Sequence, residues 1–140
     1  GTDTTQGTTP AKEHNLELKS LQDALEQYDM EEGVIPTWLP DDYKHKETQV
    51  MESPKEISIQ ASYENNDERL IIKIRQTIGI QASQIEKNEN LLEVYVVDGV
   101  EYYIFSNTET LQAAWVNGEF ECIIIGKITL EEMKEMIDSI

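Results

Sequence analysis

The chain has 140 residues and a formal net charge of −17, and Cys122 is its single cysteine. The charge argues against binding to nucleic acid or to an anionic membrane surface, because both need clustered lysine and arginine. The lone cysteine rules out an internal disulfide. A hydrophobic fraction of 39% and a charged fraction of 28% are typical of a globular protein.

Residues 1–14 lack hydrophobic periodicity and are rich in threonine. They are predicted to form a flexible tether or an expression remnant, because the chain opens with Gly1 and not with methionine. A signal or membrane anchor would then have been removed, and membrane contact is expected only through that anchor. No apolar run approaches the roughly 18 residues of a membrane span. Residues 15–140 are predicted to form a single domain.

A first helix is predicted over residues 16–30, because apolar side chains recur there at helical spacing. Gly33 is the expected stop signal. Pro36 and Pro40 then bracket Trp38 in an extended segment. Trp38 either plugs the open end of a sheet or stays exposed as an anchor for a partner. The apolar residues of the helix are Leu18, Leu21, Leu25 and Tyr28.

Three strands are predicted in the middle of the chain. Residues 43–51 are one candidate, and apolar and polar side chains alternate over residues 57–63. Over residues 70–75, Leu70, Ile72 and Ile74 alternate with Ile71, Lys73 and Arg75. A loop at residues 65–68 would place all core candidates of these two strands on one face. Residues 79–90 show no period and are predicted to be loop. The expected cross-strand pairs are Tyr63 with Leu70, Ala61 with Ile72 and Ile59 with Ile74.

A first tight hairpin is predicted at Asp98-Gly99, which suits the positive φ angles of a type I′ turn. This turn predicts three cross-strand pairs: Val94 with Tyr103, Leu92 with Phe105, and Tyr95 with Tyr102. The first two pairs are assigned to the core. The tyrosine pair falls on the opposite face, where it is a candidate recognition surface unless the final helix or a loop shields it.

A second tight hairpin is predicted at Asn117-Gly118, again with a type I′ turn. Its expected pairs are Trp115 with Phe120, Ala113 with Cys122 and Leu111 with Ile124. Trp115, Phe120 and Cys122 are therefore assigned to the core, and Glu119 and Glu121 to solvent. A cysteine among apolar neighbours is expected to be chemically inert.

The chain is predicted to end in a helix that begins at a capping box formed by Thr129 and Glu132. Ile128 and Met133 are the expected hydrophobic staple. The predicted fold is an α+β, two-layer domain. In it, an antiparallel meander sheet of five to seven strands carries an N-terminal and a C-terminal helix on one face. The buried stripe of the last helix is expected to comprise Leu130, Met133, Met136, Ile137 and Ile140.

Patterns typical of catalysis are missing from the sequence. There is no nucleophile elbow, no glycine-rich phosphate loop and no calcium loop. His14 and His45 have no metal-ligand spacing, and the many carboxylates show no sign of convergence. We therefore expect no catalytic residues, no metal site and no cofactor.

Two segments of the sequence resemble a domain-of-unknown-function family of Gram-positive bacteria. Its pattern opens with P-x-W-L-P-x-G-Y and closes with a short helix that ends in Ser-Ile. Asp42 stands where the family usually has glycine. The matching residues are Pro36, Trp38, Leu39, Pro40 and Tyr43, then Val94, Val96, Gly99 and Glu101, then Trp115 and Gly118, and finally Gly126, Thr129, Glu131, Glu132, Ser139 and Ile140.

The resemblance implies an extracytoplasmic domain of a single-pass or lipid-anchored protein, similar to the outer portions of anti-sigma-factor or sporulation-type membrane proteins. The leading hypothesis is a non-catalytic binding or sensor module that binds a protein or an envelope component through Tyr95, Tyr102 or Trp38. The alternatives are a carrier that holds a lipid or peptide between sheet and helix, and an enzyme of unrecognised type. The sequence leaves the oligomeric state open.

Overall fold

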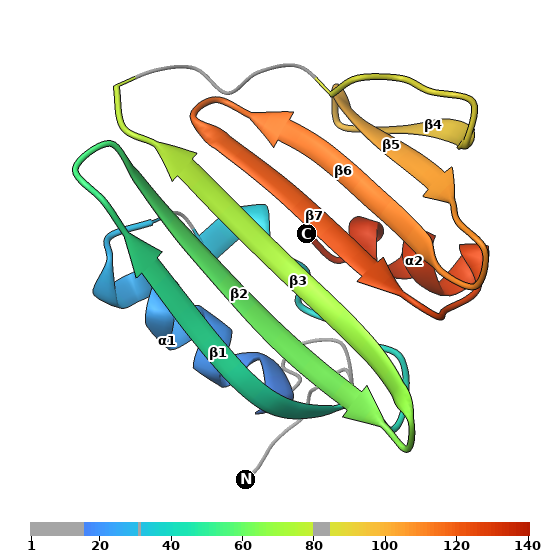
Figure 1. Ribbon diagram of the computed structural model, residues 1–140, viewed down its shortest axis with the longest axis horizontal. Helices are drawn as coiled ribbons and strands as arrows, with labels where there is room; N and C mark the ends of the chain where they lie inside the picture. Colours follow the sequence, from blue (N-terminus) through green and yellow to red (C-terminus); the bar gives the residue numbers. More distant parts are fainter. Residues whose placement is uncertain (1–15, 31, 80–84) are drawn as a thin grey trace, which may run out of the picture.

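The computed structural model describes residues 16–30, 32–79 and 85–140. They form an α+β fold with a seven-stranded antiparallel sheet and two α-helices (Figure 1). The predicted tether lies outside the described residues. None of the described helices is long and apolar enough to cross a membrane. The elements are the 3₁₀ turns η1 (Leu16–Leu18) and η2 (Glu32–Val34), the helices α1 (Lys19–Gln27) and α2 (Leu130–Asp138), and the strands β1 (Lys44–Glu52), β2 (Glu56–Asn65), β3 (Glu68–Thr77), β4 (Leu91–Val97), β5 (Val100–Ser106), β6 (Leu111–Asn117) and β7 (Phe120–Gly126).

The sheet consists of two antiparallel meanders joined side by side. Its strand order is β1-β2-β3-β7-β6-β5-β4, so β3 pairs with β7 and not with the next strand in sequence. The second meander therefore runs back toward the outside of the sheet, and the sheet edges are β1 and β4. The predicted antiparallel α+β architecture is confirmed.

Both helices pack on the same face of the sheet, as predicted, and Figure 1 shows them behind the strands. Trp115 and Tyr63 are among the largest fully buried side chains, and Met133, Met136 and Ile137 are the buried residues of α2. The helices thus cover the inner face of the sheet. Core residues with no exposed surface include Leu18, Leu21, Leu25, Ile59, Ala61, Leu70, Ile74, Ile104, Ala113, Cys122 and Ile124.

The sequence predicts the start of α2 correctly but not the end of α1. The capping box is confirmed: the Glu132 backbone N–H donates to Thr129 Oγ1 at 3.0 Å, and the Thr129 N–H donates to Glu132 Oε1 at 2.9 Å. Helix α1, in contrast, stops before Gly33. Asp29 adopts a φ of 58°, and the Met30 N–H donates to the Leu25 carbonyl at 2.8 Å. This is a Schellman ending in which aspartate takes the left-handed position usually held by glycine.

The β2–β3 hairpin has the predicted register. Tyr63 lies opposite Leu70, Ala61 opposite Ile72 and Ile59 opposite Ile74. All six side chains are buried on the inner face, which shows that alternation fixed the register here.

The β4–β5 hairpin has the predicted turn but the opposite face assignment. Tyr95 pairs with Tyr102 and Val94 with Tyr103, while a bulge at Leu92 places Leu91 opposite Phe105. Tyr102 lies in the core, so the prediction that the tyrosine pair faces away from it is wrong. The reason is that both faces of this hairpin are apolar, so alternation could not identify the buried one.

The β6–β7 hairpin differs from the prediction by two residues. Asn117 pairs with Phe120, and the turn residues are Gly118, at a φ of 64°, and Glu119. Glycine at the first turn position is typical of a type II′ turn rather than type I′. The observed pairs are Trp115 with Cys122 and Ala113 with Ile124. An even shift leaves each side chain on its predicted face, so Trp115 and Cys122 are buried as expected.

Candidate functional site

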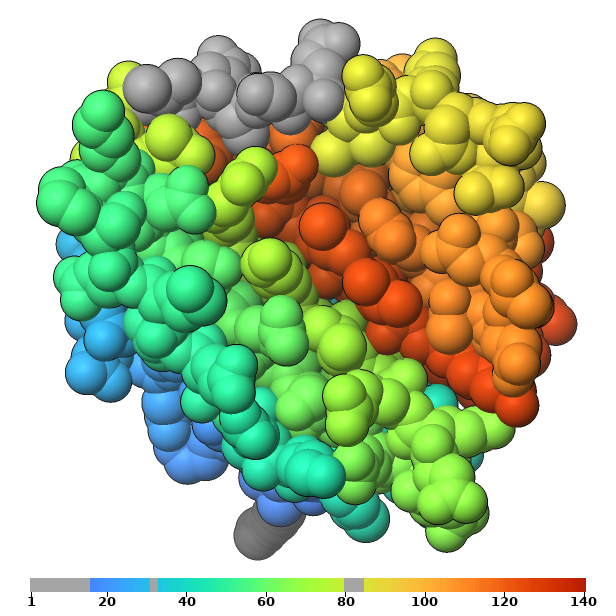
Figure 2. Space-filling view, in the orientation of Figure 1, coloured from blue at the N-terminus to red at the C-terminus, as the bar shows by residue number. Residues whose placement is uncertain are grey.

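The outer face of the sheet carries no described helix, and Figure 2 looks onto it. Side chains of Ile71, Ile123, Ile125 and Val116 lie on this face and are only partly buried. An open sheet face with apolar side chains along its middle strands is a candidate surface for binding.

The segment at residues 85–90 crosses this outer face next to β5. Phe105 and Ala114 are 6% and 3% exposed, although they lie outside the core formed with the helices. Lys87 Nζ lies 5.7 Å from the ring centroid of Tyr103 on the same strand as Phe105. Between this segment and the strands is a hollow of about 410 Å³, a size that suits a small ligand.

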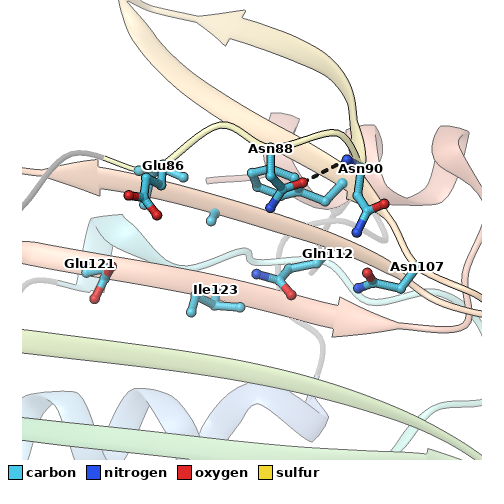
Figure 3. Close-up of a pocket in the computed structure, with 10 residues that line it drawn as sticks. Glu86, Asn88, Asn90, Asn107, Gln112, Glu121 and Ile123 are labelled. Carbon is cyan, nitrogen blue, oxygen red and sulfur yellow. Dashed lines mark hydrogen bonds between the residues drawn. The ribbon is translucent and has the colours of Figure 1, made fainter.

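Side chains from four parts of the chain line the hollow (Figure 3). The 85–90 segment lies along one side, and the ends and middles of β5, β6 and β7 form the other. The Asn90 N–H donates to Asn88 Oδ1 at 2.8 Å, which orders the segment. The lining residues are Ile85, Glu86, Asn88, Asn90, Phe105, Asn107, Gln112, Ala114, Glu121 and Ile123.

Amide side chains dominate the polar part of this lining. Each asparagine or glutamine offers both donors and an acceptor, so four of them can bind a ligand that alternates donors and acceptors. Glu86 and Glu121 add negative charge, and Glu121 forms an ion pair with Arg75 of β3. The floor, with Ala114 and Ile123, is apolar. The arrangement therefore favours a neutral or cationic polar ligand and disfavours an anion.

The predicted tyrosine surface lies elsewhere, against α2. Tyr102 is 5% exposed, and its ring centroid lies 4.9 Å from that of Trp115. Tyr95 donates a hydrogen bond to Asp138, and Lys134 Nζ lies 5.0 Å from the Tyr95 ring centroid. The final helix therefore shields the pair, which was the other reading of the sequence.

Trp38 is half-buried and packs against the core. Its backbone N–H donates to Ser139 Oγ at 3.2 Å, and the Thr37 N–H donates to the same oxygen at 3.0 Å. The Thr37 hydroxyl in turn donates to the Ser139 carbonyl at 2.8 Å. The proline-bracketed segment is thus attached to the end of α2, and Trp38 and the tyrosine pair do not line the hollow.

Other reactive side chains have structural surroundings. His45 Nε2 lies 2.7 Å from Thr48 Oγ1, and its ring contacts that of Tyr63, whereas His14 lies outside the described residues. Cys122 is fully buried, and desolvation raises the pKa of its thiol, so the thiol stays protonated. Among the residues that the structure describes, no three His, Cys, Asp or Glu side chains gather as a metal site would require.

The hollow could not be predicted from the sequence, because the segment that forms one of its sides has no periodicity. Asn88 and Asn90 lie in a stretch predicted only as loop, and Asn107 lies in a turn between strands. The one available signal was the density of amides and glutamates in the 85–90 segment.

Comparison with known proteins gives one match. The model of a family described as "Domain of unknown function (DUF4367)" matches residues 33–140. No curated protein and no solved structure matches the chain.

Proposed function

The chain belongs to the DUF4367 family, and we propose that it is a non-catalytic binding or sensor module which takes its ligand in the amide-lined hollow of the outer sheet face. The module would be the extracytoplasmic part of a membrane-anchored bacterial protein. The observation that carries this proposal is the hollow itself, with four amide side chains around an apolar floor.

The chemistry of the lining supports binding rather than catalysis. The described lining residues are amides, carboxylates and apolar residues, with no serine, cysteine, histidine or lysine among them. Amides hydrogen-bond strongly but do not transfer protons near neutral pH. The most nucleophilic group of the sheet, the Cys122 thiol, is buried on the opposite face. Of the described lining residues, only Glu86 and Glu121 are able to transfer protons, and Glu121 is ion-paired with Arg75. The lining therefore suits hydrogen bonding to a ligand better than proton transfer.

The charge of the protein narrows the class of ligand. A net charge of −17 repels anions, and Glu86 does so locally, whereas the charge of Glu121 is balanced by Arg75. Neutral amide-rich or amine-bearing components of a cell envelope, such as peptide segments, have the matching donors and acceptors. Large side chains, including Trp115, Tyr63 and Leu25, fill the space between sheet and helices. We therefore place the ligand on the outer face rather than inside, where a carrier would hold it.

Titration calorimetry with soluble cell-wall peptide fragments from a Gram-positive bacterium tests the proposal. The wild-type protein is expected to bind them, and Gln112→Ala is expected to weaken binding about tenfold, the effect of roughly one good hydrogen bond. Gln27→Ala removes an exposed amide from α1 and serves as the matched control. Equal binding by both variants, or no heat with any fragment, would refute the proposal.

A further inference from the structure

The β4 edge of the sheet is unusually apolar. Within the described ranges, β4 pairs with β5 on one side and with no strand on the other. Its sequence, LLEVYVV, has one charged residue, whereas the opposite edge strand β1 reads KHKETQVME. Natural sheets protect their edges with charges, as β1 does, because an open edge is a template for pairing with another chain. Strand β4 lacks this protection.

The turn fixes which β4 residues direct their backbone N–H and C=O groups toward β5 and which direct them away from the sheet. A two-residue type I′ turn makes its flanking residues a hydrogen-bonded pair, so Val97 directs its N–H and C=O toward β5. Such pairs alternate along an antiparallel ladder, and Tyr95 is therefore also directed inward. Val94 and Val96 direct their backbone groups outward, away from the sheet. These outward groups are available to a further strand.

The side chains on the same residues form an apolar strip. Leu92 is 50% exposed and Val96 is 57% exposed, with the partly buried Val94 between them. All three lie on the outer face of the sheet, because Val94 pairs with Tyr103 there. The other large apolar residues of the described chain that are this exposed, Leu16, Met51 and Ile78, lie in three separate segments of the chain.

From this edge we propose that β4 pairs antiparallel with β4 of a second copy of the chain, about a twofold axis at Val94. The two seven-stranded sheets then join into one continuous sheet. The backbone groups of Val94 and Val96 point away from β5, so they can pair in this register without disturbing the β4–β5 ladder, and the bulge at Leu92 lies at the end of the paired stretch. The pairs are Val94 with Val94 of the second copy, Leu92 with Val96 and Glu93 with Tyr95.

This register matches side chains across the axis. The two most exposed apolar residues of the strand, Leu92 and Val96, meet, and burying them removes apolar surface from water. On the inner face, Glu93 meets Tyr95 of the second copy. Lys134 lies 5.0 Å from the Tyr95 ring and 2.9 Å from the Glu93 carboxylate within one chain. In the dimer each glutamate therefore also approaches the lysine of the second copy, which offsets the Asp138 carboxylate bound to the same tyrosine.

The net charge determines how this association depends on salt. Two copies that each carry −17 repel one another at long range. Salt reduces the Debye length from about 10 Å at 0.1 M to about 3 Å at 1 M. The contact itself is mainly backbone pairing and apolar burial, so added salt is expected to strengthen the dimer. Since one strand pair buries less than a standard interface, the dimer belongs to the weak class.

Analytical ultracentrifugation over a wide range of protein concentration, at low and high NaCl, measures this association. We expect a monomer–dimer equilibrium that shifts toward dimer at high NaCl. Val96→Lys places a charge on the open edge and is expected to abolish the dimer. Met51→Lys makes the same change at a 71% exposed residue of β1 and should leave it intact. A protein that stays monomeric in high salt, or a dimer that Val96→Lys leaves intact, would overturn the proposal.

Cysteine cross-linking tests the register. Hydrogen-bonded partners in an antiparallel pair have Cα atoms about 5.5 Å apart, a distance that suits a disulfide. Val94→Cys should therefore form a covalent dimer on mild oxidation, and buried Cys122 should not compete. Val96→Cys should not form a covalent dimer, because the two substituted residues of the dimer would lie four residues out of register, about 13 Å apart. Equal cross-linking of both variants would indicate random collision and would contradict the twofold axis at Val94.

Discussion

The phenolic hydroxyl of Tyr95, on edge strand β4, donates a hydrogen bond of 2.8 Å to the carboxylate of Asp138 at the end of α2. Lys134, one turn earlier in the helix, pairs with Glu93 of the same strand at 2.9 Å. These contacts hold the β4–β5 hairpin against the inner layer. They leave the outer face of the hairpin to the 85–90 segment and the hollow.

Alkaline pH is expected to destabilise the protein through its tyrosines. Burial raises the pKa of Tyr63, and the hydrogen bond to Asp138 raises that of Tyr95. A group with a raised folded-state pKa stabilises the protein below its unfolded pKa, about 10 for tyrosine, and that stability is lost as pH rises through the folded value. Urea unfolding at a series of pH values should show a decline above about pH 10, less steep in Tyr63→Phe. A free energy of unfolding that stays flat to about pH 12 would contradict this.

Ser139→Ala is expected to destabilise the protein by about 1–3 kcal/mol. The Ser139 hydroxyl accepts from the Thr37 and Trp38 backbone N–H groups and donates to the Met136 carbonyl at 2.7 Å. Its loss leaves two part-buried donors without this partner. Urea denaturation measures the change, and Ser106→Ala, at an exposed serine of β5, is the control. Equal stability of the two variants would show that this contact contributes nothing.

Thr129→Ala should cost about 1 kcal/mol, the usual effect of losing an N-cap. The variant removes the acceptor for the Glu132 N–H. Thr108→Ala, at an exposed threonine in the β5–β6 connection, is expected to change the free energy of unfolding far less. Thermal and urea unfolding of both variants compare them directly, and a neutral Thr129→Ala would rule out a stabilising cap.

Asp42→Gly is expected to leave stability unchanged or to raise it, unlike most substitutions by glycine. Asp42 adopts a φ of 68°, in the left-handed region where glycine pays no steric cost. Asp41 has no positive φ for a glycine to relieve, so Asp41→Gly should lower the free energy of unfolding by up to about 1 kcal/mol, because glycine raises the entropy of the unfolded chain. Urea denaturation of both variants measures the difference between their free energies of unfolding. The prediction is contradicted if Asp42→Gly is the less stable of the two.

Cys122 is expected to resist thiol reagents in the native protein. Its side chain is 0% exposed and burial raises its thiol pKa, so the reactive thiolate is scarce. Labelling should be slow in buffer and fast in denaturant, with the native rate following global unfolding. Rapid stoichiometric labelling without denaturant would place the thiol at an accessible site.

The sequence predicted elements wherever one face of a strand or helix is polar. Tyr63 lies between the polar residues Ser62 and Glu64, so its pairing with Leu70 followed directly, and Thr129 with Glu132 marked a helix start. Prediction failed where both faces are apolar, as at Tyr95 and Tyr102, because burial then depends on how the hairpin sits on α2. It also failed at Asp29, where a residue other than glycine ends a helix in the left-handed conformation.

The candidate site was harder to predict than the fold. Tyr102 was selected from pairing alone, but its exposure depends on tertiary packing that no local pattern contains. The residues of the hollow, among them Asn88 and Gln112, come from the 85–90 segment and from the neighbouring strands β5, β6 and β7, and no local pattern shows that this segment lies against these strands.

The most direct test of a binding role for the outer face is a titration of ¹⁵N-labelled protein with the cell-wall peptide fragments, followed by amide chemical shifts. We predict that the perturbed signals belong to residues around the hollow, including Asn88, Gln112 and Ile123, while those of α1 stay in place. Perturbations confined to the helices, or none at saturating fragment, would contradict a binding site on this face.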